Sequence, residues 1–210
     1  MNLVVVGGHT RNIGKTSVMA ELIRALTPPR WTAVKITQYG HGICSLDGKP
    51  CACEPEEHGF VLSEEKDRAG RADTCRLLVA GAKRSLWLRA RQGQLAAALP
   101  ALHRALRGEG WVMIESNSVL GFLKPVLYLF LLDPSRQDFK ASARNYLERA
   151  DALIALDSLA GSNPWPGVAD AILRQKPSFV VSRQDYRSRE LNSFVREKLG
   201  LEAVAQSFEF

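Results

Sequence analysis

The sequence lacks any apolar run long enough to cross a membrane. Its densest apolar stretch, Val126–Leu132, has seven residues, whereas a membrane-spanning helix needs roughly 18. No basic segment precedes the short apolar run Leu3–Val6, which argues against a secretory signal peptide. Cysteine is scarce as well, and four in 210 residues argue against a disulfide framework. These absences predict a cytoplasmic protein without a membrane span.

The composition also excludes collagen-like and low-complexity classes, because the 16 glycines and 10 prolines are close to the average share. A chain of 210 residues, 46% of them apolar, can bury a full core, so we expect a single domain over residues 1–210. The net charge of +6 favours anionic partners such as nucleotides, nucleic acid or phosphorylated metabolites. Nucleic acid is the weakest of these, because the basic residues are not interleaved with aromatic ones.

Apolar runs typical of buried strands alternate with helical patterns along the whole chain. Strands are expected near Leu3–Val6, Trp31–Ile36, Ser85–Arg89, Trp111–Glu115, Val126–Leu132, Ala152–Leu156 and Ser178–Val181. Helices are expected at Lys15–Leu26, Arg68–Ala80, Gln92–Leu106, Phe139–Arg149, Gly167–Leu173 and Arg187–Leu199. This alternation predicts an α/β fold, a three-layer sandwich with a mostly parallel central sheet. Residues at about 38–67, which include cysteines and many acids, predict an insertion.

The sharpest motif lies between the first strand and the first helix, where glycines precede Gly-Lys-Thr. Its candidate phosphate-binding residues are Gly8, His9, Thr10, Arg11, Asn12, Ile13, Gly14, Lys15, Thr16 and Ser17. Backbone N–H groups of such a loop and the N-terminal end of the helix bind phosphate oxygens. We expect Lys15 to reach the β- and γ-phosphates and the Thr16 hydroxyl to bind Mg²⁺. The motif therefore predicts a phosphate-loop fold that binds a nucleoside triphosphate, ATP or GTP.

The spacing of this motif departs from the common one. His9 stands where the first glycine is usual, and Gly8 gives the pattern G-x5-G-K-T. The alternative is an ordinary turn between strand and helix in which Lys15 is solvated. The strand–loop–helix context favours the phosphate loop.

A resemblance to two families supports this interpretation. The loop resembles that of dethiobiotin synthetases, which also have G-x5-G-K-T. The segment Ala33–Thr37 resembles the part of the second strand that carries a lysine, both in that family and in molybdopterin-guanine dinucleotide biosynthesis protein B. The segment Asp73–Ala82 is similar to the Asp-Ser…Ala-Gly-Ala helix of protein B. Met113–Glu115 matches a strand that ends in Glu in both families, although Ser116–Ser118 replaces their usual glycine. The resemblance covers about residues 3–132 and implies a phosphate-loop NTPase.

Candidate Mg²⁺ ligands are the acids that follow predicted strands, at the edge where ligands bind in open α/β sheets. These are Glu115, Asp133 and Asp157. The apolar run before Asp133 looks more like the common Walker B pattern, whereas the family resemblance favours Glu115. As a Mg²⁺ ligand beside Thr16 we place Glu115 first and Asp133 second. The alternative for Asp133 is that it only stabilises a turn.

The predicted catalytic residues are Lys15, Lys35, Glu115 and Asp73. Lys35 would add positive charge at the γ-phosphate, since phosphoryl transfer depends on positioning and charge neutralisation. The resemblance implies that Asp73 positions water or supports the metal from the outer sphere. Arg11 could neutralise phosphate charge in its own subunit or in a partner's, so a homodimer is one candidate assembly.

A further nucleotide contact is predicted near the last strand, at Asp185. Ser182, Arg183 and Asp185 stand where guanine-specific NTPases have Asn-Lys-x-Asp, and a carboxylate there could accept hydrogen bonds from guanine. The alternative is that Asp185 caps the next helix.

The second informative cluster contains three cysteines near a predicted turn at Asp47-Gly48. Cys44, Cys51 and Cys53, with His41 or His58 as the fourth ligand, are candidate zinc ligands. The alternatives are free thiols or one oxidised pair. Cys75, at helical spacing, is expected in the core.

These residues lead to three hypotheses. The first is Mg²⁺-dependent hydrolysis of ATP or GTP that assists molybdopterin or other cofactor biosynthesis, through a cofactor-assembly or metalloenzyme partner. The second is a metallochaperone-like NTPase that uses the cysteine segment. The third is a phosphotransferase or ligase on a small anionic substrate near Arg71 and Arg76.

Overall fold

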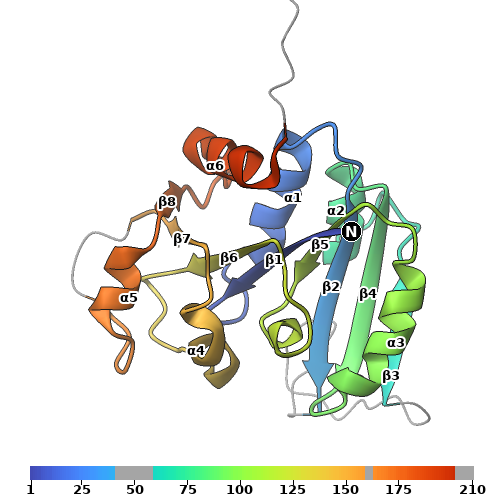
Figure 1. Ribbon diagram of the computed structural model, residues 1–210, viewed down its shortest axis with the longest axis horizontal. Coiled ribbons are helices and arrows are strands. Elements are labelled where there is room, and N and C mark those ends of the chain that lie inside the picture. Colours follow the sequence, from blue (N-terminus) through green and yellow to red (C-terminus); the bar gives the residue numbers. More distant parts are fainter. Residues whose placement is uncertain (41–58, 159–162, 202–210) are drawn as a thin grey trace, which may run out of the picture.

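The computed structural model describes residues 1–40, 59–158 and 163–201. Within them one sheet has the strand order β3-β4-β2-β5-β1-β6-β7-β8 (Figure 1). The strands are β1 (Asn2–Gly8), β2 (Thr32–Tyr39), β3 (Phe60–Glu64), β4 (Arg84–Arg91), β5 (Trp111–Glu115), β6 (Leu127–Leu132), β7 (Ala152–Leu156) and β8 (Ser178–Val181). Neighbouring strands are parallel, except that β3 pairs antiparallel with β4.

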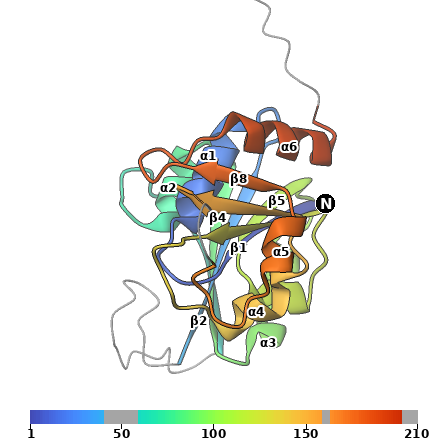
Figure 2. The same ribbon diagram turned by 90° about the vertical axis from the view of Figure 1, so that its left-hand side faces the viewer.

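Helices cover both faces of the sheet (Figures 1 and 2). One face carries α1 (Lys15–Ala25), α2 (Asp73–Val79) and α6 (Arg189–Leu199). The other carries α3 (Leu95–Ala105), α4 (Ala141–Leu147), α5 (Asp170–Gln175) and the short 3₁₀ helix η1 (Ser118–Gly121). The predicted three-layer α/β fold with a mostly parallel sheet is confirmed.

The apolar runs form the central strands because both of their faces are covered. In β1, Leu3 and Val5 pack toward α3 and α4, whereas Val4 and Val6 pack toward α1 and α6. All six residues of β6 are buried. A strand buried on both faces needs apolar residues at successive positions, and the sequence provides them.

Part of the predicted insertion at about 38–67 belongs to the sheet, because β2 continues to Tyr39 and residues 60–64 form the edge strand β3. One predicted helix boundary needs correction. Helix α2 begins at Asp73 instead of Arg68, after a turn in which Asp67 accepts a hydrogen bond from the Ala69 amide. The 3₁₀ helix η1 was not predicted.

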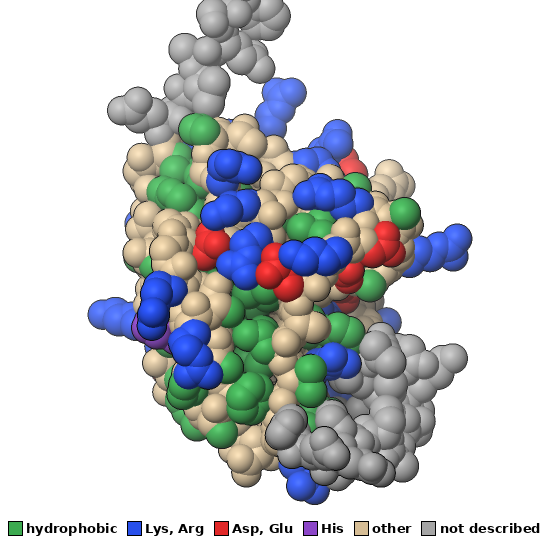
Figure 3. Space-filling view, turned by 90° about the vertical axis from the view of Figure 1, so that its right-hand side faces the viewer, with side chains coloured by type: hydrophobic (Ala, Val, Ile, Leu, Met, Phe, Trp, Pro, Cys, Tyr) green, Lys and Arg blue, Asp and Glu red, His purple; other side chains and the backbone are tan. Residues whose placement is uncertain are grey.

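The surface formed by α2, α3, β3 and β4 carries many basic side chains (Figure 3). Part of this charge is neutralised locally. Glu109 lies 3.0 Å from both Lys83 and Arg84, and Arg84 also pairs with Glu64. These pairs fasten the edge of the sheet and reduce the net charge of this face. Among the residues placed by the structure, no helix is long and apolar enough to span a bilayer.

Candidate nucleotide-binding site

The loop between β1 and α1 has the backbone geometry of an anion site. Asn12 and Gly14 both have positive φ, 54° and 88°, and they flank Ile13, whose side chain is buried in the core. Left-handed residues at alternate positions turn successive N–H groups toward one side, which creates a concave anion-binding backbone. The free N–H groups at the start of α1 add positive potential there. The loop is therefore shaped for phosphate oxygens.

Lys15 lies over this loop. Its ammonium donates a hydrogen bond to the Thr10 carbonyl at 2.6 Å. Burial lowers the pKa of Lys15, partly offset by the negative charge of Glu115. Among the described residues, this partly buried ammonium is hydrogen-bonded by a carbonyl oxygen alone, and it is well suited to pair with an incoming phosphate.

Lys35, in the middle of β2, lies between two carboxylates, Asp73 at the start of α2 and Glu115 at the end of β5. Its ammonium contacts Asp73 directly and lies 3.5 Å from the Glu115 carboxylate. Burial alone would lower the pKa of Lys35, but the charges of Glu115 and Asp73 outweigh it and raise that pKa. Burial likewise opposes ionisation of Asp73, but Lys35 outweighs it and lowers the pKa of Asp73. Both groups are therefore charged at neutral pH.

Thr16 and Glu115 offer the oxygen ligands expected for Mg²⁺. The Thr16 hydroxyl donates to Glu115 Oε2 at 2.5 Å, and Lys35 Nζ lies 3.4 Å from the same hydroxyl. Mg²⁺ prefers hard oxygen ligands and is usually held by one or two carboxylates together with phosphates and water. The donor set fits Mg²⁺ bound jointly with a nucleotide. No group of three or more His, Cys, Asp or Glu that could hold a metal occurs in residues 1–40, 59–158 and 163–201.

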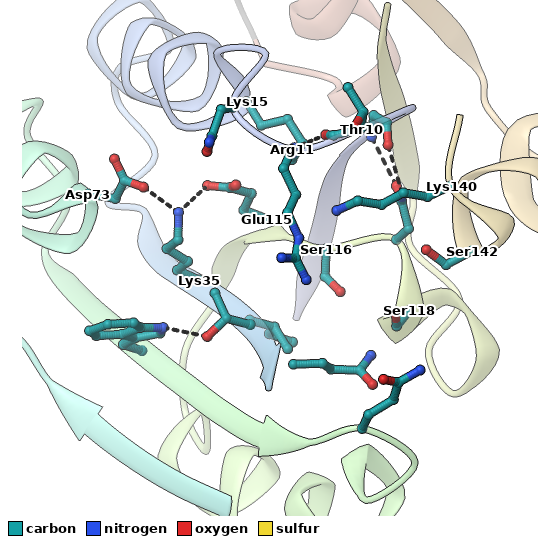
Figure 4. A pocket seen from close by; sticks show the side chains of 18 of the residues that line it. Thr10, Arg11, Lys15, Lys35, Asp73, Glu115, Ser116, Ser118, Lys140 and Ser142 are labelled. Atoms are coloured by element: carbon teal, nitrogen blue, oxygen red, sulfur yellow. Dashed lines mark hydrogen bonds and ion pairs between the residues drawn. The ribbon is translucent and has the colours of Figure 1, made fainter. Parts of the chain in front are cut away.

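A pocket of about 1020 Å³ at the carboxyl edge of the sheet is lined by eight of the predicted catalytic and nucleotide-binding residues (Figure 4). Those that line it are Gly8, Thr10, Arg11, Asn12, Lys15, Lys35, Asp73 and Glu115. Arg71 also lines it, whereas Arg76 and Ser17 lie at a separate cavity, where Arg76 donates to the Ser17 hydroxyl at 2.7 Å.

His9 does not contribute its side chain to this pocket. Its ring is fully buried against Phe139 and Trp165. Nδ1 bonds the Asp138 carbonyl at 2.9 Å, and Nε2 accepts from the Asp133 amide at 3.0 Å. The His9 side chain fastens the predicted phosphate loop to the segment that follows β6. Only its backbone remains near the site.

Asp133, the second candidate for Mg²⁺, is engaged elsewhere. It is fully buried, and both carboxylate oxygens bond Arg183, whose guanidinium also binds Asp157 at 2.6 Å. Burial would raise the pKa of Asp133, but Arg183 outweighs it and lowers that pKa. Arg183 thus ties the ends of β6, β7 and β8 together.

Asp185 lies outside the main pocket, at the second cavity. Its carboxylate accepts a hydrogen bond from the Arg187 amide at 3.1 Å, which stabilises the turn before α6. The N-cap of α6 is Ser188, which accepts from the Leu191 amide. The structure therefore places Asp185 in a local turn, at a cavity that Ser17 also lines, and its role toward the base stays a prediction.

The candidate zinc ligands Cys44, Cys51, Cys53, His41 and His58 all lie outside the described residues. Cys75 is buried, and its thiol bonds the Gly70 carbonyl at 3.0 Å. Its predicted place in the core is confirmed.

Two pocket residues that sequence reasoning missed are Asn117 and Lys140. Asn117 accepts from the Gly8 amide at 2.9 Å and donates to the Gly8 carbonyl at 2.8 Å, so it holds both sides of this residue. Lys140 enters from the segment between β6 and α4. The sequence signal that could have found Asn117 and Lys140 is their position alone, because both follow strands that end at the edge of the sheet where ligands bind.

No family profile and no curated protein sequence matches this chain. Among solved structures, LpxK from Aquifex aeolicus in complex with ATP aligns with a TM-score of 0.46 and 16% identity over 86% of this chain and 53% of that one. HypB from Helicobacter pylori in complex with nickel aligns with a TM-score of 0.47 and 16% identity over 98% and 91%. The chain thus spans about half of the LpxK chain. Both likenesses are distant and concern the fold alone.

Proposed function

We propose that this protein binds Mg²⁺ together with ATP or GTP and hydrolyses the γ-phosphate, and that this cycle assists the assembly of molybdopterin or another cofactor. The observation that supports the enzymatic part is the convergence of Lys15, Lys35, Thr16 and Glu115 around one concave loop. The cofactor-assembly part rests on the resemblance of residues 3–132 to the two families named above.

In this mechanism a water attacks the γ-phosphorus, and the bond to the β–γ bridging oxygen breaks. Lys15 and Lys35 stabilise the negative charge that spreads over the phosphoryl oxygens. Bound Mg²⁺, held by Thr16 and Glu115, would neutralise charge on the same phosphates. Asp73 acts through Lys35, because its carboxylate contacts that ammonium directly and fixes its position.

The decisive variant is Lys15→Ala. We expect its kcat for phosphate release to fall about 100-fold or more, because a buried charge at the transferred group is lost. Nucleotide at 100 times its Kd stabilises a protein by about 2.7 kcal/mol, which corresponds to a Tm increase of about 5–11 °C for this chain length. Thermal unfolding with Mg²⁺ and each nucleotide should show this increase in the wild type and lose it in Lys15→Ala.

The matched control is Lys124→Ala, at an exposed lysine outside the pocket. It should keep the wild-type increase in Tm. Wild-type nucleotide affinity in Lys15→Ala would refute the phosphate-loop assignment. The comparison of ATP with GTP in the same assay identifies the preferred base.

A further inference from the structure

The pocket extends beyond the phosphate loop. At about 1020 Å³ it lies at the upper end of the range for small-molecule sites. The triphosphate would lie along residues 8–16, between Lys15 and Lys35. The rest of the pocket reaches toward η1 and the start of α4, where Ser118, Lys140 and Ser142 line it (Figure 4).

Lys140 extends into the pocket beside this outer part, with its ammonium directed toward Arg11 (Figure 4). Its backbone amide donates to the His9 carbonyl at 2.9 Å, so its position is tied to the phosphate loop. Its ammonium forms no hydrogen bond or ion pair with any residue that the structure describes. Burial, reinforced by the positive charges of Arg11 and Lys15, lowers the pKa of Lys140 to about 7. An anion at this position would relieve that repulsion.

Two hydroxyl groups complete the arrangement. Ser118 lies at the start of η1 and Ser142 in the first turn of α4, and both lie on the same side of the pocket as Lys140 (Figure 4). Within the described parts of the chain, neither hydroxyl has a hydrogen-bond partner. The carboxylate closest in sequence to Lys140, Asp138, is engaged by the Thr10 hydroxyl. One ammonium and two hydroxyls suit the oxygens of a phosphate group.

We propose that this outer part of the pocket binds a second, small phosphate-bearing molecule beside the nucleotide, through Lys140, Ser118 and Ser142. The proposal rests on the proposed function, since it assigns the remaining space of the nucleotide pocket. This site differs from the small-anion site predicted near Arg71 and Arg76. Arg76 lies at the second cavity, where it pairs with Asp73 and donates a hydrogen bond to Ser17.

The test uses inorganic phosphate as the probe. Isothermal titration calorimetry measures its binding to the full chain saturated with Mg²⁺ and a non-hydrolysable nucleotide analogue. We expect one phosphate per chain, and about tenfold weaker binding or more in Lys140→Ala, because a hydrogen bond to a charged group is lost. The double variant with Ser118→Ala and Ser142→Ala should also bind phosphate more weakly. Lys124→Ala should behave as the wild type.

The outcomes separate the two proposals. Phosphate binding that Lys140→Ala leaves unchanged, or no phosphate binding to the loaded protein, overturns the second site but not the proposed function. Phosphate that binds only by displacing the analogue also overturns the second site. A wild-type protein that binds no nucleotide analogue overturns both.

Discussion

At the residue scale, Asn117 supports the backbone of the loop between β1 and α1. Its amide group bonds both the N–H and the carbonyl of Gly8, at 2.9 and 2.8 Å. A Cβ at Gly7 would collide with the same side chain, so glycine is required there. Among residues 116–118, Asn117 is the one whose side chain bonds this loop in the part of the chain that the structure describes.

We therefore predict that Asn117→Ala costs about 1–3 kcal/mol in the free energy of unfolding, because it leaves two backbone groups of Gly8 without their partners. Nucleotide affinity should fall in parallel, since the loop loses its support. Urea denaturation and nucleotide titration measure the two effects. Asn145→Ala, at an exposed position of α4, is the control and should change neither. Unaltered stability of Asn117→Ala would contradict this role.

The His9 ring gives a second prediction at this scale, because its hydrogen bonds fix its protonation state. The Asp138 carbonyl can only accept and the Asp133 amide can only donate, so Nδ1 carries the proton and Nε2 carries none. Burial lowers the pKa of His9 from its ordinary value of 6.5. The unfolded chain therefore binds this proton more readily than the folded one.

Stability should consequently decrease as the pH falls through 6.5, by at most about 1.4 kcal/mol per pH unit for one such group. Urea denaturation between pH 5 and 7.5 measures this slope. It should become shallower in His9→Gln and stay unchanged in His103→Gln, where the imidazole is exposed. Equal slopes in the wild type and His9→Gln would exclude the neutral ring.

At the scale of elements, the start of α1 depends on Gly14. Its φ of 88° is unfavourable for any residue with a Cβ, and an added Cβ would lie 2.7 Å from the Tyr186 hydroxyl oxygen. We predict that Gly14→Ala costs more than the roughly 1–3 kcal/mol of backbone strain alone, and that it abolishes nucleotide binding.

Gly93→Ala separates strain from collision. Gly93 has a similar φ of 84°, but a Cβ added there would meet no atom within 4 Å. Urea denaturation should therefore show a smaller loss of stability in this variant, with nucleotide binding intact. Equal losses in the two variants would show that the Tyr186 contact contributes nothing.

The sequence predicts well the elements whose apolar residues follow the positions that are buried. The continuous apolar runs of β1, β6 and β7 are buried on both faces, and the apolar spacing of α1 matches its buried side. Strand β3 escaped prediction because it is a half-buried edge strand of five residues, without a continuous apolar pattern. The 3₁₀ helix η1 spans only four residues, too few for a periodic signal.

At the scale of the whole molecule, the residue pattern alone predicts site residues only within one short motif, to which Lys15 and Thr16 belong. The placement of Lys35 and Glu115 drew on the family resemblance. Asn117 lies 109 residues from Gly8 in sequence, and Asp138 lies 128 from Thr10. Contacts over such distances depend on strand order, which the apolar pattern does not encode.

Convergence of distant segments also sets the charge of Lys140 in the nucleotide-free protein. Arg11 and Lys15 face it with positive charge, and Asp138 and Glu115 with negative charge. Burial and the two cations prevail and lower its pKa to about 7. A bound triphosphate brings several negative charges into the same pocket, so it should raise this pKa again. Nucleotide binding is thereby linked to protonation of Lys140.

We therefore predict that the protein takes up as much as about one proton through Lys140 when nucleotide binds at pH 7.5. Calorimetric titrations in buffers of different ionisation enthalpy measure this number. The matched variant is Lys140→Arg, which keeps a positive charge at every pH and should lose this uptake. Because protons of the nucleotide and of Lys15 contribute in both proteins, the difference between them isolates Lys140. Identical proton uptake would show that Lys140 is already charged before the nucleotide arrives, and that the cations around it are better screened than the structure implies.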